Sequence, residues 1–314
     1  MGKMKNQMVC DSDALHAANR SCLTRDPLTG DLVIFAPGRR KRPQPGSKKA
    51  DADPLSAENL NDDKILAVYA KDGFRITAVE NLYPVFHKDR ELKGRQEILV
   101  EGDRCQRFED FSATQMAAVL DAMADRAKVL RSDPGLKYLV MFKNEGREAG
   151  ASLVHAHSQV FGLSFVPDRL KQMRTNRRKI TDLHSAMLGE ATKERAVFKD
   201  KNIVAFADPY SRFAYGVRLV TRRRHDNITQ TSPAERRSLA KALAMLMPLI
   251  KKRGFAYNFY FHDVFSDKNE FFEIRFAPRA NTWAGFELDA GIVVNPVTAE
   301  DAAAEYLDAI RGKK

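Results

Sequence analysis

The order of predicted secondary-structure elements occurs twice along this chain of 314 residues. Strands precede a long amphipathic helix that two further strands follow, first within about 64–163 and again within about 202–277. Each long helix opens with a capping-box pattern, Ser-Ala-Thr-Gln from Ser112 and Ser-Pro-x-Glu from Ser232. This order predicts an α+β fold in which one unit is duplicated.

The predicted boundaries follow from hydrophobic periodicity and from turn residues. We expect an N-terminal half at 25–167, a basic helical connector at 168–195 and a C-terminal half at 196–314. The predicted strands are 32–36, 64–70, 74–79, 95–101, 137–144, 153–163, 202–207, 215–220, 255–263, 270–277 and 285–294. The predicted helices are 112–131, 233–252 and 298–311.

The composition is that of a globular protein, with 44% hydrophobic and 30% charged residues. No apolar run approaches the ~20 residues of a membrane span, and no secretory signal is present. The three cysteines are far apart, which predicts neither a disulfide framework nor a four-thiolate zinc site. We therefore expect a cytoplasmic protein without a membrane partner.

The net charge of +11 favours polyanionic or phosphorylated partners. Basic residues gather at 39–42, 174–179 and 222–224. Aromatic residues do not alternate with these clusters, so they lack the pattern of a base-stacking surface. A nucleic-acid-binding protein remains an alternative, but we predict no nucleic-acid partner.

The stretch GASLVHAHSQVFGL, residues 150–163, carries the most chemistry in the chain. Residues i and i+2 of a strand face the same side, so His155, His157 and Gln159 are expected to lie on one face. The stretch permits a polar sheet face, a metal site or a nucleophilic histidine. A metal would need further ligands, and neither His87 nor Cys105 has a recognisable ligand spacing.

A neutral imidazole can attack phosphorus and divide one transfer into two easier steps. The motif HAHSQ, preceded by FKNEG and GAS, resembles the galactose-1-phosphate uridylyltransferase branch of the histidine-triad superfamily. DPLTGDLVIFAPGRRKRP at 26–43, ENLYPVF at 80–86 and WAGFELDAG near the C-terminus also resemble segments of that branch, in the same order. The resemblance covers about 25–312. It implies two histidine-triad-like halves that form a mostly antiparallel open sheet flanked by helices.

The resemblance also implies roles for individual residues. His157 would become the nucleotidylyl-histidine, supported by His155. The other implied site residues are Gln159, Gly150 and Ser152 for phosphate oxygens, Asn144 for ordering the phosphate loop, Arg39 and Arg42 for nucleotide phosphates, Asn81 and Tyr83 for base and ribose, and Phe286 and Glu287 for the sugar.

The sequence departs from the family at its metal sites. The region 44–80 has no cysteine, and Arg104 stands where a later zinc ligand is expected. Glu273 and Arg275 stand where a second metal would have histidines, and only His262 remains. We therefore predict no metal and no cofactor.

The expected activity is nucleotidyl transfer from a nucleoside-diphosphate sugar to a sugar 1-phosphate, in a homodimer. Asn281 and Val293 replace sugar-reading residues of known uridylyltransferases, so the acceptor stays open. An ADP-sugar phosphorylase, a diadenosine polyphosphate phosphorylase and a non-catalytic nucleotide-binding protein are the alternatives.

Overall fold

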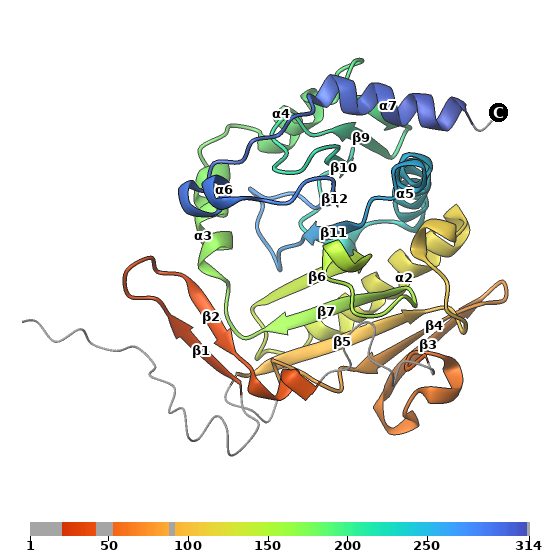
Figure 1. Ribbon diagram of the computed structural model, residues 1–314, viewed down its shortest axis with the longest axis vertical. Coiled ribbons are helices and arrows are strands. Elements are labelled where there is room, and N and C mark those ends of the chain that lie inside the picture. The colour runs from red at the N-terminus through yellow and green to blue at the C-terminus, as the bar shows by residue number, and fades with distance from the viewer. Residues whose placement is uncertain (1–20, 42–52, 88–91, 313–314) are drawn as a thin grey trace, which may run out of the picture.

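A ten-stranded antiparallel sheet organises the protein, in the order β3-β4-β5-β7-β6-β11-β12-β10-β9-β8 (Figure 1). The computed structural model describes residues 21–41, 53–87 and 92–312. The strands of the large sheet are β3 Ile65–Lys71, β4 Phe74–Glu80, β5 Gly94–Glu101, β6 Tyr138–Glu145, β7 His157–Leu163, β8 Ala196–Lys199, β9 Ile203–Ala207, β10 Val217–Thr221, β11 Tyr257–His262 and β12 Glu273–Pro278. A separate hairpin pairs β1 Cys22–Arg25 with β2 Leu32–Phe35.

The strand order shows the duplication directly. The first half runs 3-4-5-7-6 from its outer edge inward, and the second half runs 8-9-10-12-11 in the same way. The halves meet where β6 pairs with β11, for example through Asn144 and Asn258. The predicted α+β class and the mostly antiparallel open sheet are therefore confirmed. The boundaries at 25–167, 168–195 and 196–314 remain our proposed division of the chain.

Six α-helices flank the sheet: α2 Ala113–Arg131, α3 Asp168–Arg177, α4 Leu183–Gly189, α5 Pro233–Arg253, α6 Gly285–Ala290 and α7 Ala299–Arg311. Both predicted capping boxes form. Ser112 Oγ accepts from the backbone N–H of Gln115, and Ser232 Oγ accepts from that of Glu235. Because helix α5 also has Pro233 at its first turn, its start is specified twice.

One hydrophobic core lies between the sheet and the helices α2, α5 and α7. It includes strand residues from both halves, such as Leu99 and Ile274, both fully buried. Helices α3 and α6 lie elsewhere (Figure 1), and α3 residues line a cavity over the sheet face that carries Phe142 and Tyr260. The helix-covered face thus carries most of the apolar core, and the cavity lies over the opposite face.

Two predicted elements are wrong. The strand expected at 285–294 is instead the short helix α6, whose first turn is closed by Glu287 accepting from the backbone N–H of Ala284 at 3.0 Å. The strand expected from residue 153 begins only at His157, because the N–H of Ala156 donates to the carbonyl of Gln106 in a neighbouring loop. The disulfide at Cys22 was not expected from the sequence either, whereas Cys105 is free and exposed.

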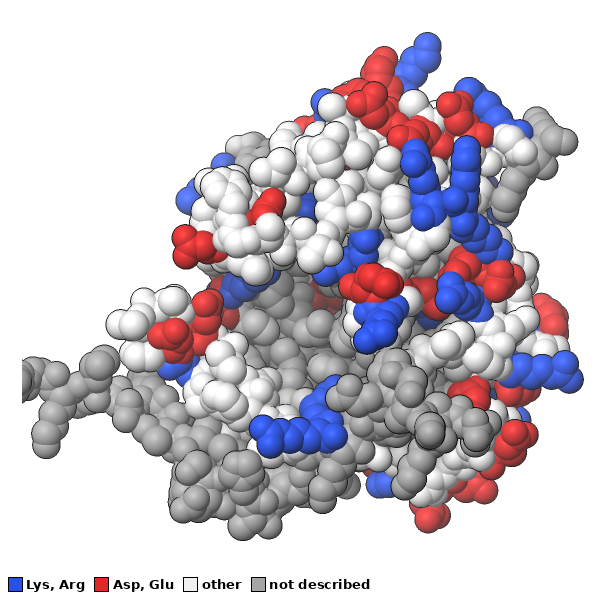
Figure 2. Space-filling model, in the orientation of Figure 1, with Lys and Arg blue, Asp and Glu red and all other residues white. Residues whose placement is uncertain are grey.

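On the face drawn in Figure 2, described basic side chains stand beside acidic ones and form no continuous basic stripe. Within the described ranges, no helix combines the length and the apolar character that crossing a bilayer requires.

Candidate active site

The loop between β6 and β7 brings two histidines to the end of the sheet. It turns at Gly146 and Gly150, whose φ angles of +84° and +85° suit glycine. A side chain at Gly146 would also place its Cβ 2.6 Å from Ala256. The amide of Asn258 donates to the Asn144 side chain and to the Ala149 carbonyl, each at 2.8 Å. The loop is therefore held against the central strand β11.

His157 is the first residue of β7, and only 7% of it is exposed. Its Nδ1 lies 2.8 Å from the backbone carbonyl oxygen of His155. A carbonyl can only accept, so Nδ1 carries the hydrogen, and the lone pair of the neutral ring is on Nε2. This tautomer has its basic nitrogen at the outer end of the ring, as a nucleophile requires.

His155 precedes the strand and has a fully buried side chain. Its Nδ1 lies 2.5 Å from Asp53 Oδ2, and its Nε2 lies 3.0 Å from the Gly102 carbonyl oxygen. The carbonyl requires N–H at Nε2, and the short contact with Asp53 requires a proton between Nδ1 and the carboxylate. Both ring nitrogens of His155 are thus engaged. The same residue supplies the carbonyl that orients His157.

A buried charged cluster lies beneath β7, on the face of the sheet opposite the His157 side chain. The ammonium of Lys143, with no exposed side-chain surface, donates to Glu101 Oε2 at 2.8 Å and to the His157 carbonyl oxygen at 3.1 Å. Ser158 donates to the other oxygen of Glu101 at 2.5 Å. This cluster was not expected from the sequence, although Lys143 and Glu101 stand at inward-facing strand positions, a signal that could have revealed it.

Glu145 is part of this cluster, 3.9 Å from the Lys143 ammonium. Burial raises the pKa of its carboxyl group to about 7. A raised pKa in the folded state means that this carboxyl contributes to stability at low pH. Its contribution is lost as the pH rises from the unfolded value towards 7, because the folded protein then holds a proton that the unfolded chain releases.

Glu145→Gln should remove that pH dependence. We expect the variant to gain stability relative to the wild type above about pH 7, by on the order of 1–3 kcal/mol, and to gain little near pH 4. Urea unfolding at several pH values measures the difference. A constant difference between the two proteins from pH 4 to pH 8 would contradict the prediction.

Comparisons with known proteins identify relatives over most of the chain. A galactose-1-phosphate uridylyltransferase of Thermotoga maritima is 24% identical over 315 residues, covering 90% of this chain and 96% of the relative. An ADP-glucose phosphorylase of Arabidopsis thaliana is 22% identical over 90% of this chain and 91% of its own. The chain is thus similar, over most of its length, to galactose-1-phosphate uridylyltransferases and to an ADP-glucose phosphorylase.

Solved structures share the fold of this protein. A uridylyltransferase superposes with a TM-score of 0.78 at 21% identity, covering 92% of this chain and 98% of the other. The Arabidopsis ADP-glucose phosphorylase with bound ADP-glucose has a TM-score of 0.75 at 20% identity, with the same coverage. Residues 39–166 match a family model described as the N-terminal domain of DUF4931, a domain of unknown function.

Some expected site residues lie on neighbouring elements. Gln159 lies two residues after His157 on the same face of β7, opposite Phe142. Asn144 is one position beyond the last paired residues and adjoins His157 across the strands. Gly150 and Ser152 belong to the connecting loop. These residues thus all belong to β6, β7 or the loop that joins them.

Other expected residues lie on other elements of the chain. Asn81 accepts from the N–H of Tyr83 in the turn after β4 and lines a separate cavity of about 310 Å³. Arg39 is half-buried in a 3-10 helix, Pro37–Lys41, and Arg42 lies outside the described residues.

The expected sugar-binding residues Phe286 and Glu287 lie on α6. Neither lines the cavity that contains Asn144, and Glu287 closes the first turn of its own helix. Their role in sugar binding therefore stays a prediction.

The expected metal positions are occupied by side chains that pair with one another. Glu273 and His262 are fully or almost fully buried, and Arg177, Arg218 and Arg275 all contact Glu273. Among the described residues, no group of three or more His, Cys, Asp or Glu side chains is arranged to hold a metal ion.

Proposed function

We propose that this protein transfers a nucleoside monophosphate from a nucleoside-diphosphate sugar to a sugar 1-phosphate through a covalent intermediate on His157. The observation that carries the proposal is the hydrogen bond from His157 Nδ1 to the His155 carbonyl, which leaves the lone pair on Nε2. The relationship to uridylyltransferases and an ADP-glucose phosphorylase over most of the chain supports the substrate class.

In the first step, Nε2 of His157 attacks the α-phosphorus of the donor. A P–N bond forms, the bond from phosphorus to the bridging oxygen breaks, and sugar 1-phosphate leaves with that electron pair. The ring becomes positively charged, and the His155 carbonyl stabilises the charge through Nδ1–H. In the second step, an acceptor oxygen attacks the same phosphorus and the P–N bond breaks, which restores the lone pair on Nε2.

The supporting roles extend the same proposal. Gln159, Ser152 and Asn144, on β7, the preceding loop and β6, would donate to phosphate oxygens near His157. Arg39 carries the guanidinium expected to bind the nucleotide phosphates. The scheme assigns no step to a metal, and both ring nitrogens of His155 bond to oxygens.

A second candidate differs only in the acceptor. The ADP-glucose phosphorylase is nearly as similar to this chain as the uridylyltransferase, by identity and by fold. The acceptor would then be inorganic phosphate, and the product a nucleoside diphosphate.

We also propose a homodimer. Apolar side chains on and after α6 are strongly exposed, namely Phe286, Leu288, Ile292 and Val294 at 56–71%. Sedimentation that finds only monomers at micromolar concentration would contradict this part of the proposal.

The decisive experiment is the intact mass of the protein after brief incubation with UDP-glucose and, separately, with ADP-glucose. We expect a gain of one UMP or one AMP, which identifies the base. Chasing the labelled protein with glucose 1-phosphate or with inorganic phosphate identifies the acceptor by loss of the added mass. No gain with either donor would contradict the proposal.

A further inference from the structure

An arginine-rich cavity of about 560 Å³ begins beside Asn144 and extends across the second half of the sheet. It lies between α3, the loop 208–213 and the strands β6, β11 and β12. Its lining includes one carboxylate, Asp208, and five arginines, namely Arg169, Arg212, Arg218, Arg275 and Arg279. The excess of positive charge is large for one cavity and favours an anionic ligand.

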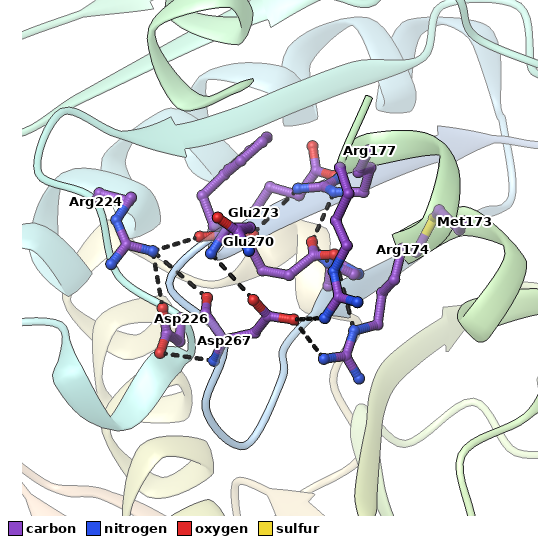
Figure 3. Close-up of polar contacts among 12 residues, drawn as sticks. Met173, Arg174, Arg177, Arg224, Asp226, Asp267, Glu270 and Glu273 are labelled. Carbon is purple, nitrogen blue, oxygen red and sulfur yellow. Dashed lines mark hydrogen bonds and ion pairs between the residues drawn. The ribbon is translucent and has the colours of Figure 1, made fainter. Parts of the chain in front are cut away.

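Two of these arginines are already neutralised. Arg218 lies 2.7 Å from Asp208 and donates to Glu273 at 2.9 Å. Arg275 donates to Glu273 at 2.8 Å, and Arg177 reaches the same carboxylate from α3. Figure 3 shows Arg177 beside Glu270 and Glu273, within the network that fixes α3 over the sheet. This network holds the wall of the cavity in place.

The other three arginines have no acidic partner within the described part of the chain. Among the residues that the structure describes, none gives Arg169, Arg212 or Arg279 a carboxylate partner. An arginine side chain that lines a cavity without an acidic partner retains its full charge for a ligand.

Two of them are held by aromatic rings in one stack. Arg279 lies 5.0 Å from the centre of the Phe213 ring, and Phe213 stacks on Trp283 at 5.4 Å and 18°. Arg212 lies 4.5 Å from the Trp283 ring on the indole side of the stack. Such contacts use the face of a guanidinium group, whereas its five N–H donors lie in its plane. The arginines are thus oriented while their donors can bind anionic oxygens in pairs.

The cavity is also longer than one phosphate. Directly paired residues form a row across the sheet from Gln159 through Phe142 and Tyr260 to Arg275. That row crosses three strand spacings, roughly 14 Å. A ligand that begins near Asn144 can therefore extend along the sheet towards the arginines, and the volume is that of a whole small-molecule site.

We propose that Arg169, Arg212 and Arg279 bind a second anionic group, a phosphate or a carboxylate, on a sugar phosphate whose reacting phosphate lies at His157. The placement of the reacting phosphate rests on the proposed function, whereas the anionic subsite rests on the arginines alone. The substrate class is thus a sugar phosphate with two negatively charged groups, rather than a hexose 1-phosphate whose sugar is uncharged.

The test compares glucose 1-phosphate, which has one anionic group, with glucose 1,6-bisphosphate and glucuronic acid 1-phosphate, which have two. Calorimetry gives each affinity. Trp283 is the only tryptophan of the chain, so its fluorescence reports whether a ligand reaches the stack. We expect at least one doubly charged ligand to bind about tenfold or more tightly than glucose 1-phosphate and to change the emission, since one charge-assisted bond suffices for that difference. The tighter of the two identifies phosphate or carboxylate as the second group.

Arg169→Gln and Arg279→Gln should each reduce that preference several-fold without changing the affinity for glucose 1-phosphate. Arg169 is outside the stack, so its replacement leaves the surroundings of the indole unchanged. Arg311→Gln on α7, where the side chain is 74% exposed, is the matched control and should behave as the wild type. Equal affinities for all three ligands, or a preference that survives in both variants, would overturn the proposal.

Failure of the subsite is distinguishable from failure of the proposed function. Binding needs no turnover and should persist in His157→Asn. Tight binding of a doubly charged ligand without covalent labelling by any donor would reject the enzyme mechanism and keep the arginine subsite. Labelling at His157 without any preference for doubly charged ligands would reject the arginine subsite and keep the enzyme mechanism.

Discussion

His157→Gly should abolish covalent labelling by nucleotide sugars and reduce turnover by at least about a thousandfold, because the atom that attacks phosphorus is gone. The remaining site would still bind and orient the donor, so its affinity for the donor should change little. Intact mass measures the labelling, and steady-state rates measure the turnover. Circular dichroism and thermal unfolding check the fold, which we expect to persist because His157 is the first residue of its strand.

The matched control changes the neighbouring histidine. In His155→Ala the nucleophile remains, and its Nδ1–H can still donate to the backbone carbonyl of residue 155. We expect slower labelling rather than none, since the ring contacts with Asp53 and Gly102 that fix this carbonyl are lost. Labelling in His157→Gly at the wild-type rate would show that the nucleophile is another residue.

The sequence alone predicted the features that depend on local patterns. Both long helices follow from their caps at Ser112 and Ser232 and from their apolar spacing. The two halves follow from the repeated order of elements. The placement of His157 and Gln159 on one strand face follows from the period of two in a strand.

What the sequence could not show depends on contacts between distant segments. His155 was expected on the strand, but its ring contacts Asp53, 102 positions away in the chain, and the strand therefore starts later. The segment after Trp283 alternates like a strand, yet it has no partner at a sheet edge and forms a helix. The pairing of Lys143 with Glu101 joins two strands whose neighbourhood appears only once β5, β7 and β6 are placed in order.

Lys143→Met should destabilise the protein by about 3–5 kcal/mol, because it leaves the carboxylate of Glu101 buried without a cation. Neither side chain of this pair has exposed surface, so water cannot replace the lost partner. The substitution also removes the donor to the His157 carbonyl, so covalent labelling should slow as the start of β7 becomes less well fixed. Urea unfolding and the rate of the mass gain measure the two effects.

A second replacement separates two effects of Lys143→Met: the destabilisation by the unpaired carboxylate of Glu101, and the loss of the hydrogen bond to the His157 carbonyl. In the double variant Lys143→Met with Glu101→Gln, the carboxylate that the first replacement leaves without a cation is itself replaced by a neutral amide. Much of the stability should therefore return. The rate of labelling should not return, since the bond to the His157 carbonyl is still missing. Lys251→Met is the control in an exposed pair with Asp110 and should cost at most about 1 kcal/mol. If Lys143→Met costs no more than Lys251→Met, or if the double variant recovers its labelling rate together with its stability, then the buried pair does not position the nucleophile.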